Sequence, residues 1–434
     1  MSTHTLATSA PAEARPVSRR RAIAAITIGN GLEFYDFTVY SFFAVMIGKL
    51  FFPSQGPMGS LLASLATFGV GFVARPLGGV LIGLYADRVG RKPAMTLTLF
   101  LMGLGAALFV VAPTHAQAGI VGPAMIVLAR LIQGFALGGE VGASTSLLME
   151  YADDNSRGYY GSWQLFSQGL SVLIGSLVGL TLTNMLPPEA LESWGWRVPF
   201  ALGVLVIPVG VYIRRHLEET GGAAHGGEAS EKAGLVEVFT RHGRMVLAGV
   251  LVTIGGTAAT YIVLHYMTNY AVKVLKMPLG TSMWAGCLAA ALHVLLAAYA
   301  GRVSDRLGRR TVILWPRVAL LLLIYPAFVF VNANPTLPAL LGAVGVLAVL
   351  LVFTAVPSVV LLSELFPRRI RATGLSIVYC IGVLVFGGFA QFFATLLIDL
   401  TGSPNAPALY VIGCCLVSLV GLGMVPETAG RKLS

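Results

Sequence analysis

The chain has 434 residues, of which 56% are apolar and only 11% are charged. Soluble proteins carry about a quarter charged residues, and the mean hydropathy of +0.80 points the same way, so we predict an integral membrane protein. The formal net charge of +10 does not indicate a nucleic-acid partner, because the Lys and Arg residues sit in short segments between apolar runs and form no single basic surface.

Twelve apolar runs follow a polar N-terminal stretch, residues 1–21, which we expect to be a disordered cytoplasmic tail. Each run can supply a helix of the roughly 20 residues that cross a bilayer. The runs lie at about 22–48, 61–84, 94–113, 119–149, 158–184, 196–213, 245–270, 280–301, 311–332, 336–363, 372–399 and 405–425.

The widest polar gap, residues 214–244, separates the first six runs from the last six. It contains GGAAHGGEASEKAG, a composition typical of a flexible linker, and we place it in the cytoplasm. We therefore expect an all-α integral membrane protein with twelve transmembrane helices in two pseudo-symmetric six-helix bundles, 22–213 and 245–425. A short cytoplasmic tail, 426–434, follows the second bundle.

The distribution of basic residues predicts the orientation of the chain. With the N-terminus inside, nearly all loop Lys and Arg residues fall on the inner side, and only Lys49, Lys273 and Lys276 lie in outer loops. Basic residues mark cytoplasmic loops, so we expect both termini in the cytoplasm and the chain in a cell inner membrane.

Motifs of catalysis and of ATP binding are absent from the sequence. It contains no HExxH, no GxSxG nucleophile turn and no Walker motif, so neither an enzyme nor an ATP-driven pump is predicted. The cysteines occupy apolar stretches without the spacing of metal ligands, and we expect packing residues, no metal and no cofactor. They are Cys287, Cys380, Cys414 and Cys415.

A charged motif occurs at equivalent places in the two halves. GLYADRVGRK (83–92) precedes the third run, GRVSDRLGRR (301–310) precedes the ninth, and a Glu followed seven positions later by an Arg occurs after the fourth and the tenth runs. We interpret these residues as a conformational gate on the cytoplasmic side; the alternative is that the loops only set the topology. The gating candidates are Asp87, Arg88, Arg91, Glu150, Arg157, Asp305, Arg309, Glu364 and Arg371.

The repeated loop motif resembles the signature of the major facilitator superfamily, and the similarity covers essentially residues 22–425. Further stretches resemble its metabolite:proton symporter branch: GNGLEFYDFTVYS, VARPLGG, ARLIQGFALGGEVG, RGYYGSWQ and ESWGWRVPF. The resemblance, which is greatest to citrate/tricarballylate carriers, implies proton-coupled symport of a small organic carboxylate by alternating access, in a bacterial, monomeric protein. α-Ketoglutarate, shikimate or another metabolite are the alternative substrates, and sodium is the alternative coupling ion.

Charged residues inside the predicted helices are the candidates for ion coupling. A charge that faces lipid at the bilayer centre costs at least about 2.5 kcal/mol, so these residues should face one another or a polar cavity. The resemblance favours Asp36 with Arg130 as the proton switch. Glu33, which shares a helical face with Asp36, and Glu140 are further candidates, and a static ion pair is the alternative interpretation.

Substrate binding is predicted mainly for Arg75, because a guanidinium binds a carboxylate through two hydrogen bonds. Arg197 is a second candidate, with a role at the membrane interface as its alternative. His265 is the third, although a single histidine in a helix more often serves packing. We expect His293 to pack and Arg317 to extend toward the interface. Polar contacts to substrate, or hydrogen bonds between helices, are expected of Tyr35, Gln164, Gln168, Tyr266 and Asn269.

Overall fold

The computed structural model describes residues 19–54, 56, 58–89, 91–138, 140–205, 207–208, 228–367 and 370–431. Every regular element in these ranges is a helix. Side chains at several helical positions, among them 86–88, 91–92 and 140–143, lie outside the described part.

The described part of the first half consists of helices and the segments that connect them. The helices are α1 (Arg19–Phe42), α2 (Ala44–Phe51), α3 (Gly59–Val73), α4 (Arg75–Val89), α5 (Arg91–Val111), α6 (His115–Ala118), α7 (Val121–Ala136), α8 (Glu140–Glu150), α9 (Arg157–Met185), α10 (Pro188–Ala190), η1 (Leu191–Gly195) and α11 (Arg197–Val204).

The second half begins, in its described part, with α13 (Glu228–Thr260), which is kinked at His242. Its further elements are η2 (Tyr261–Tyr266), α14 (Met267–Lys273), α15 (Leu279–Leu307), α16 (Arg309–Ala333), α17 (Leu337–Glu364), α18 (Arg371–Val383), η4 (Leu384–Gly388), α19 (Ala390–Thr401) and α20 (Ala406–Met424).

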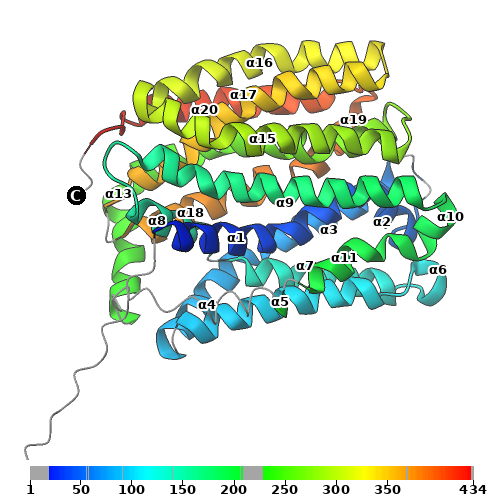
Figure 1. Cartoon of the computed structure of the whole chain (residues 1–434), viewed down its shortest axis with the longest axis horizontal. Coiled ribbons are helices and arrows are strands. Elements are labelled where there is room, and N and C mark those ends of the chain that lie inside the picture. The colour runs from blue at the N-terminus through cyan, green and yellow to red at the C-terminus, as the bar shows by residue number, and fades with distance from the viewer. Residues whose placement is uncertain are drawn as a thin grey trace, which may run out of the picture.

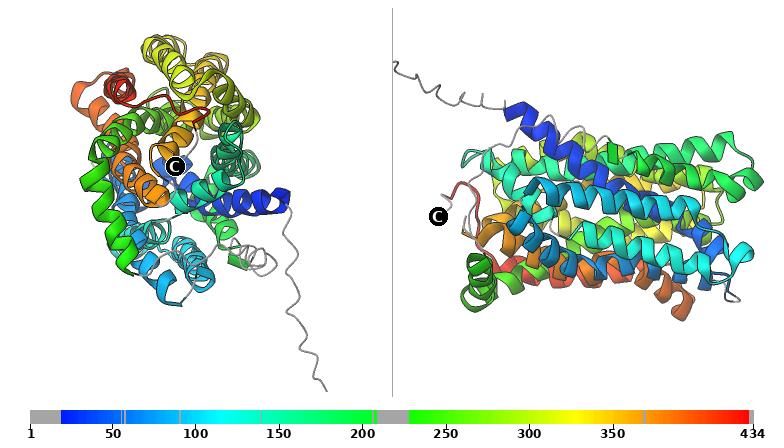
Figure 2. Two further views of the ribbon diagram at one scale, coloured as in Figure 1. Left: turned by 90° about the vertical axis from the view of Figure 1, so that its left-hand side faces the viewer. Right: turned by 90° about the horizontal axis from the view of Figure 1, so that it is seen from below.

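The long helices run side by side along the long axis of the molecule (Figure 1), and a view along this axis shows them end-on as a bundle (Figure 2). α1 begins and α20 ends at the same end of the bundle, which we call the terminal end; α6 and α10 lie at the opposite, distal end. Glycines separate helices at sharp corners: Gly308 (φ +93°) lies between α15 and α16, and Gly402 (φ +66°) follows α19. These φ values favour glycine, because it has no Cβ to clash.

The twelve predicted runs fall mainly on helix in the described part of the chain. The second is interrupted between α3 and α4, the fourth between α7 and α8, and the sixth can be followed only as far as the described residues reach. Within the described part, eight helical stretches are long and apolar enough to cross a membrane, and a bent pair makes a ninth. The pair is α1 and α2, which meet at an angle of 64° near Phe43, where we had predicted one straight helix. No Pro or Gly lies at this bend, and nothing in the structure explains it.

Residues 228–244 are helical, although we had assigned 214–244 to a flexible linker. The segment EASEKAGLVEVF is rich in good helix formers, and α13 runs through it with one non-helical residue, His242. The predicted linker is therefore too long at its C-terminal side, and residues 209–227 lie outside the described part.

The two halves meet along several pairs of helices. α9 packs along α15 and α17, α8 packs against α17 and α18, and α3 packs against η4 and α19. At the terminal end the backbones of α9 and α15 nearly touch, since a Cβ added to Gly158 would lie 2.4 Å from the carbonyl oxygen of Gly301. Small residues permit this close approach, as is typical of helix interfaces in membranes.

Candidate functional site

A row of buried, hydrogen-bonded side chains joins α1 to α7. The amide nitrogen of Gln133 donates to Asp36 Oδ2 at 3.1 Å, and Gln133 Oε1 accepts a hydrogen bond from Arg130 Nη1 at 3.0 Å. All three side chains are buried. The other carboxylate oxygen of Asp36 lies against Gly203 of α11, where a Cβ would come within 2.0 Å of it. The predicted acid and base thus lie in one network, but a glutamine bridges them.

Two arginines of the first half lie on aromatic rings. The guanidinium carbon of Arg130 is 4.0 Å from the ring centre of Phe37 and 4.5 Å from that of Tyr40, and the same carbon of Arg75 is 3.9 Å from the ring centre of Phe72. Rings in this position stabilise a cation without a counter-charge, by up to about 2 kcal/mol when water is absent. This packing makes two buried cations compatible with an apolar surrounding.

A cavity of roughly 70 Å³ lies between helices of the two halves. α1, α3 and α9 line it mainly with apolar side chains, such as Phe34, Phe37 and Phe68, and with Gln168. The opposite wall is more polar and includes Thr253, Thr257, Thr260, Tyr261, His265, His293, Ser358 and Tyr379. Its volume of roughly 70 Å³ is well below the about 300–1,000 Å³ of typical small-molecule pockets.

Two histidines from the second half line this cavity, where we had expected His293 to serve packing only. His265 stacks on Tyr261 with ring centres 5.2 Å apart. The Nδ1 atoms of His265 and His293 are buried and have no hydrogen-bond partner among the described residues. Each ring thus has one nitrogen whose capacity as donor or acceptor is not used by the described residues.

Arg75 lines a second, smaller cavity of roughly 20 Å³ rather than the central one. Tyr379 of α18 is part of both walls, so the two cavities are adjacent. Nε and Nη2 of Arg75 have no hydrogen-bond partner in the described part of the chain. Its guanidinium thus lies at the interface of the two halves, and the N–H groups of Nε and Nη2 form no hydrogen bond with the described residues.

Hydrogen bonds close the interface on the distal side of the cavity. Ser41 of α1 and Gln391 of α19 exchange hydrogen bonds of 3.1 and 2.8 Å, and Asn269 of α14 donates to the carbonyl of Ser41 at 2.7 Å. Next to them, a Cβ on Gly69 of α3 would come within 2.6 Å of the ring of Phe389. Neutral polar and aromatic contacts therefore hold this side together.

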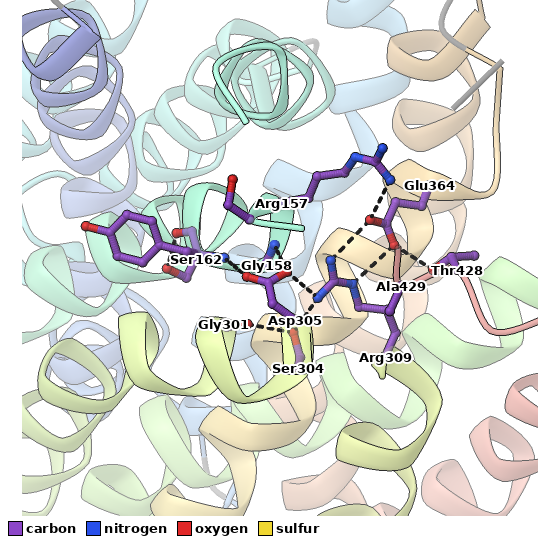
Figure 3. Close-up of polar contacts among 12 residues, drawn as sticks. Arg157, Gly158, Ser162, Gly301, Ser304, Asp305, Arg309, Glu364, Thr428 and Ala429 are labelled. Carbon is purple, nitrogen blue, oxygen red and sulfur yellow. Dashed lines mark hydrogen bonds and ion pairs between the residues drawn. The ribbon is translucent and has the colours of Figure 1, made fainter. Parts of the chain in front are cut away.

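An ionic cluster closes the terminal end (Figure 3). Asp305 of α15 accepts hydrogen bonds from the backbone N–H groups of Gly158 and Tyr159 at 2.7 and 2.9 Å, at the start of α9. Arg309 Nη1 lies 2.8 Å from Asp305, and its Nε lies 3.2 Å from Glu364. A carboxylate is favourable at the N-terminus of a helix, so this contact attaches α15 to α9 of the other half.

The same cluster contains a second bridge between the halves. Arg157 Nη1 of α9 lies 3.5 Å from Glu364 of α17, and Arg157 also contacts Asp154. Thr428 donates to Glu364 at 2.5 Å, and the carbonyl of Arg431 accepts from Arg157 at 2.8 Å. The predicted gate residues Arg157, Asp305, Arg309 and Glu364 are therefore in contact, and the segment after α20 joins them.

Several predicted substrate contacts lie elsewhere. Arg197 donates to the carbonyls of Val110, Ser193 and Ala112 and so caps the end of α5 instead of facing a cavity. Gln164 bonds to Asn30 and Ser144 within the first half. The hydroxyl of Tyr266 bonds to Thr395 within the second half, while Tyr35 is buried with an unpaired hydroxyl among the described residues.

The remaining predicted residues either lie outside the described side chains or are characterised by their exposure alone. The side chains of Asp87, Arg88, Arg91 and Glu140 lie outside the described residues. Glu150 is exposed at the end of α8, whereas Glu33 and Arg371 are buried.

Gln133, Gln391 and Thr428 were not predicted. Only Gln133 had a sequence signal, its i, i+3 spacing from Arg130 on one helical face; Gln391 and Thr428 are brought to the site by contacts with distant segments.

Comparison with known proteins agrees with this architecture. The family model of the Major Facilitator Superfamily matches residues 26–378. A citrate-proton symporter of Klebsiella pneumoniae is 31% identical over 93% of this chain and 91% of its own. A proline/betaine transporter of Salmonella typhimurium is 31% identical over 95% and 85%, and an alpha-ketoglutarate permease of Escherichia coli is 32% identical over 96% of both chains.

The fold is also shared with a solved transporter. The crystal structure of a D-xylose-proton symporter superposes with a TM-score of 0.76 and covers 95% of this chain and 99% of its own, at 19% sequence identity. The predicted fold class is thus confirmed. The chain belongs to the Major Facilitator Superfamily, a family of multi-pass membrane transporters and not of enzymes.

Proposed function

We propose that this protein is a proton-coupled symporter of an organic carboxylate, of the citrate or tricarballylate type, that works by alternating access. The observation that carries the proposal is a small cavity between two halves that contact each other on both of its sides. A substrate reaches such a cavity only when one set of contacts breaks while the other holds. That is the requirement for a carrier, whereas a channel needs a continuous pore.

The two sets of contacts differ in chemistry, which suits gates that open in turn. The terminal end depends on charged groups such as Asp305, Arg157 and Glu364, whereas the distal side depends on neutral hydrogen bonds and aromatic packing. We place the terminal end in the cytoplasm, where the basic loops lie, and propose the two six-helix halves predicted from the sequence, 22–213 and 245–425.

The proton site is proposed at Asp36. Its carboxylate is buried and held by Gln133, and Arg130 lies at the other end of that glutamine. A carboxylate that loses such partners favours its protonated form, and one that regains them favours the charged form. Small movements of α7 relative to α1 can therefore load and release a proton. Glu33 and Glu140 stay secondary candidates, and sodium is the alternative coupling ion.

The substrate is proposed to be anionic because one cation without a counter-charge, Arg75, borders the interface. Arg75 has free donors beside the cavity, and His265 and His293 line the cavity itself. Two relatives are named as a citrate-proton symporter and as an alpha-ketoglutarate permease, and both of these compounds are carboxylates. We therefore propose a tricarboxylate and a dicarboxylate as the first substrates to test in transport assays.

The aromatic wall supports a second candidate, a betaine or another zwitterion. Phe34, Phe37, Phe68, Tyr261 and Tyr379 line the cavity, and aromatic rings bind quaternary ammonium groups. A relative is named as a proline/betaine transporter. Such a substrate also carries a carboxylate, so both candidates need a cation in the site.

Uptake into proteoliposomes with an inward proton gradient tests the proposal. The native chain is compared with Arg75→Ala and Asp36→Asn, using labelled citrate, α-ketoglutarate, shikimate and glycine betaine. We expect gradient-driven accumulation of one of the carboxylates, its loss in Arg75→Ala, and exchange without gradient response in Asp36→Asn. Uptake that follows sodium and ignores pH would exclude the proton role of Asp36. If only betaine accumulates, the second candidate replaces the first.

A further inference from the structure

A third cation lies buried behind the wall of the central cavity, in the second half. Arg317 of α16 is 1% exposed, and we had expected it to extend toward the membrane interface instead. Its Nη1 donates to the carbonyl of Val252 at 3.2 Å and to Ser418, and its Nη2 donates to Ser358 Oγ at 3.2 Å. The guanidinium is therefore held at the junction of α13, α17 and α20.

All of these partners are neutral. Among the described residues no Asp or Glu forms an ion pair with Arg317, and no ring is stacked on it as on Arg75 and Arg130. A buried charge without a counter-charge is strongly unfavourable. The position of this cation thus calls for an anion that the described part of the chain does not supply.

The cavity is the place from which that anion can come. Val252, Gly256 and Ser358 all line it, and two of them bond directly to the guanidinium. Gly256 has no side chain, and a Cβ there would lie 3.0 Å from Arg317 Nη2. Arg317 does not itself line the cavity, but three residues of the wall, Val252, Gly256 and Ser358, lie against its guanidinium.

We propose that Arg317 is an anion subsite of the second half and that a carboxylate of the substrate, seated against Gly256 and Ser358, is its counter-ion. The inference rests on the proposed function and deepens it. Arg75 belongs to the first half and Arg317 to the second, so a substrate with two or more carboxylates contacts both halves, whereas a monocarboxylate reaches one cation at a time. The subsite therefore selects di- and tricarboxylates.

Counterflow kinetics with the purified full chain in proteoliposomes test this subsite. We compare Arg317→Gln, Arg317→Lys and Gly256→Ala with Gly413→Ala, a helical glycine at which a Cβ would meet nothing within 4 Å. Arg317→Gln should raise the half-saturation concentration of the transported di- or tricarboxylate at least tenfold, and Lys should restore part of it. Gly256→Ala should also raise it, because the methyl group fills the space beside the guanidinium and the charge stays.

The outcomes separate the inference from the proposed function. If the native chain moves no carboxylate of the panel, the function fails, and the inference with it. If the native chain transports but Arg317→Gln and Gly256→Ala lower only the unfolding temperature, Arg317 is a packing residue and the inference alone is overturned. If Arg317→Gln does not fold, Gly256→Ala decides, since unchanged half-saturation in that variant contradicts the subsite.

Discussion

The contact between Asp305 and the start of α9 should set how firmly the terminal end stays closed. Asp305 accepts two backbone hydrogen bonds from the other half and pairs with Arg309, and its side chain is 8% exposed. In Asp305→Asn one oxygen acceptor stays but the charge is lost. Hydrogen bonds to a charged group contribute about 1.5–3 kcal/mol, and a carboxylate at a helix N-terminus contributes about 0.3–1 kcal/mol.

The expected loss is therefore about 2–3 kcal/mol of the free energy that closes this end. At about 1.4 kcal/mol for each factor of ten, the open population should rise about 30- to 150-fold. A reporter is Ser162→Cys on α9, since Ser162 is buried where α9 meets Gly301 of α15. In a chain whose four native cysteines are replaced by serine, its rate of maleimide labelling measures opening.

Asp399→Asn is the matched control, because Asp399 is exposed near the end of α19. Asp305→Asn should label at least tenfold faster than the control. Equal labelling rates in the two variants would refute the reasoning, because the helix-end contact would then contribute nothing to closure.

Three further variants test other parts of the structure. Gln133→Leu removes the hydrogen bonds that link Asp36 to Arg130 and leaves both buried side chains without this partner. The free energy of unfolding should fall by about 1–3 kcal/mol, which thermal unfolding in detergent measures. An unchanged unfolding temperature would show that the bridge is dispensable. Gly134→Ala places a Cβ 1.7 Å from a backbone oxygen of α3, and this overpacking should cost about 1–3 kcal/mol, whereas Gly413→Ala should not. For Glu427, beyond α20, burial alone would raise the carboxyl pKa, but four backbone N–H groups donate to it and lower that pKa below its ordinary value of 4.5. Glu427 thus adds stability above about pH 4.5, and this stability is lost as the pH falls through its lowered pKa. The native chain should therefore unfold at a higher temperature than Glu427→Gln near neutral pH, and this difference should shrink on acidification. A difference that stays constant with pH would contradict this origin.

The helical architecture follows largely from the sequence, because a helix that crosses a membrane needs a long apolar run. The predicted runs fall mainly on helix in the described part of the chain, and the ends of α4 and α15 lie at the terminal end of the bundle. The misses are local. The bend between α1 and α2 contains no Pro or Gly from which it could have been predicted. The helical segment that begins at Glu228 lacks the apolar pattern on which the prediction of helices depended.

The site was less predictable, since sequence distance says little about which buried groups face one another. Asp36 and Arg130 were paired by resemblance, but the glutamine between them is visible only once α1 and α7 are packed. The role of Arg197 was ambiguous in the sequence, because a guanidinium near a membrane interface can donate to carbonyl groups at a helix end or bind a ligand. In the structure it donates to carbonyl groups at the end of α5. Arg317 was misjudged because only the packing of α13 and α17 shows how near it lies to the cavity.

The buried cations also bear on why the carrier closes at all. In the closed arrangement Arg75 and Arg317 lie near the interface without a carboxylate partner among the described residues. If the proposed anion binds between them, it should stabilise the closed state more than any open state, because water screens the same charges once an end opens. Differential affinity of this kind is the only way in which a ligand can shift a conformational equilibrium. The substrate anion would therefore be cargo and also the group that permits passage through the closed state, so that movement of the two halves is coupled to its presence.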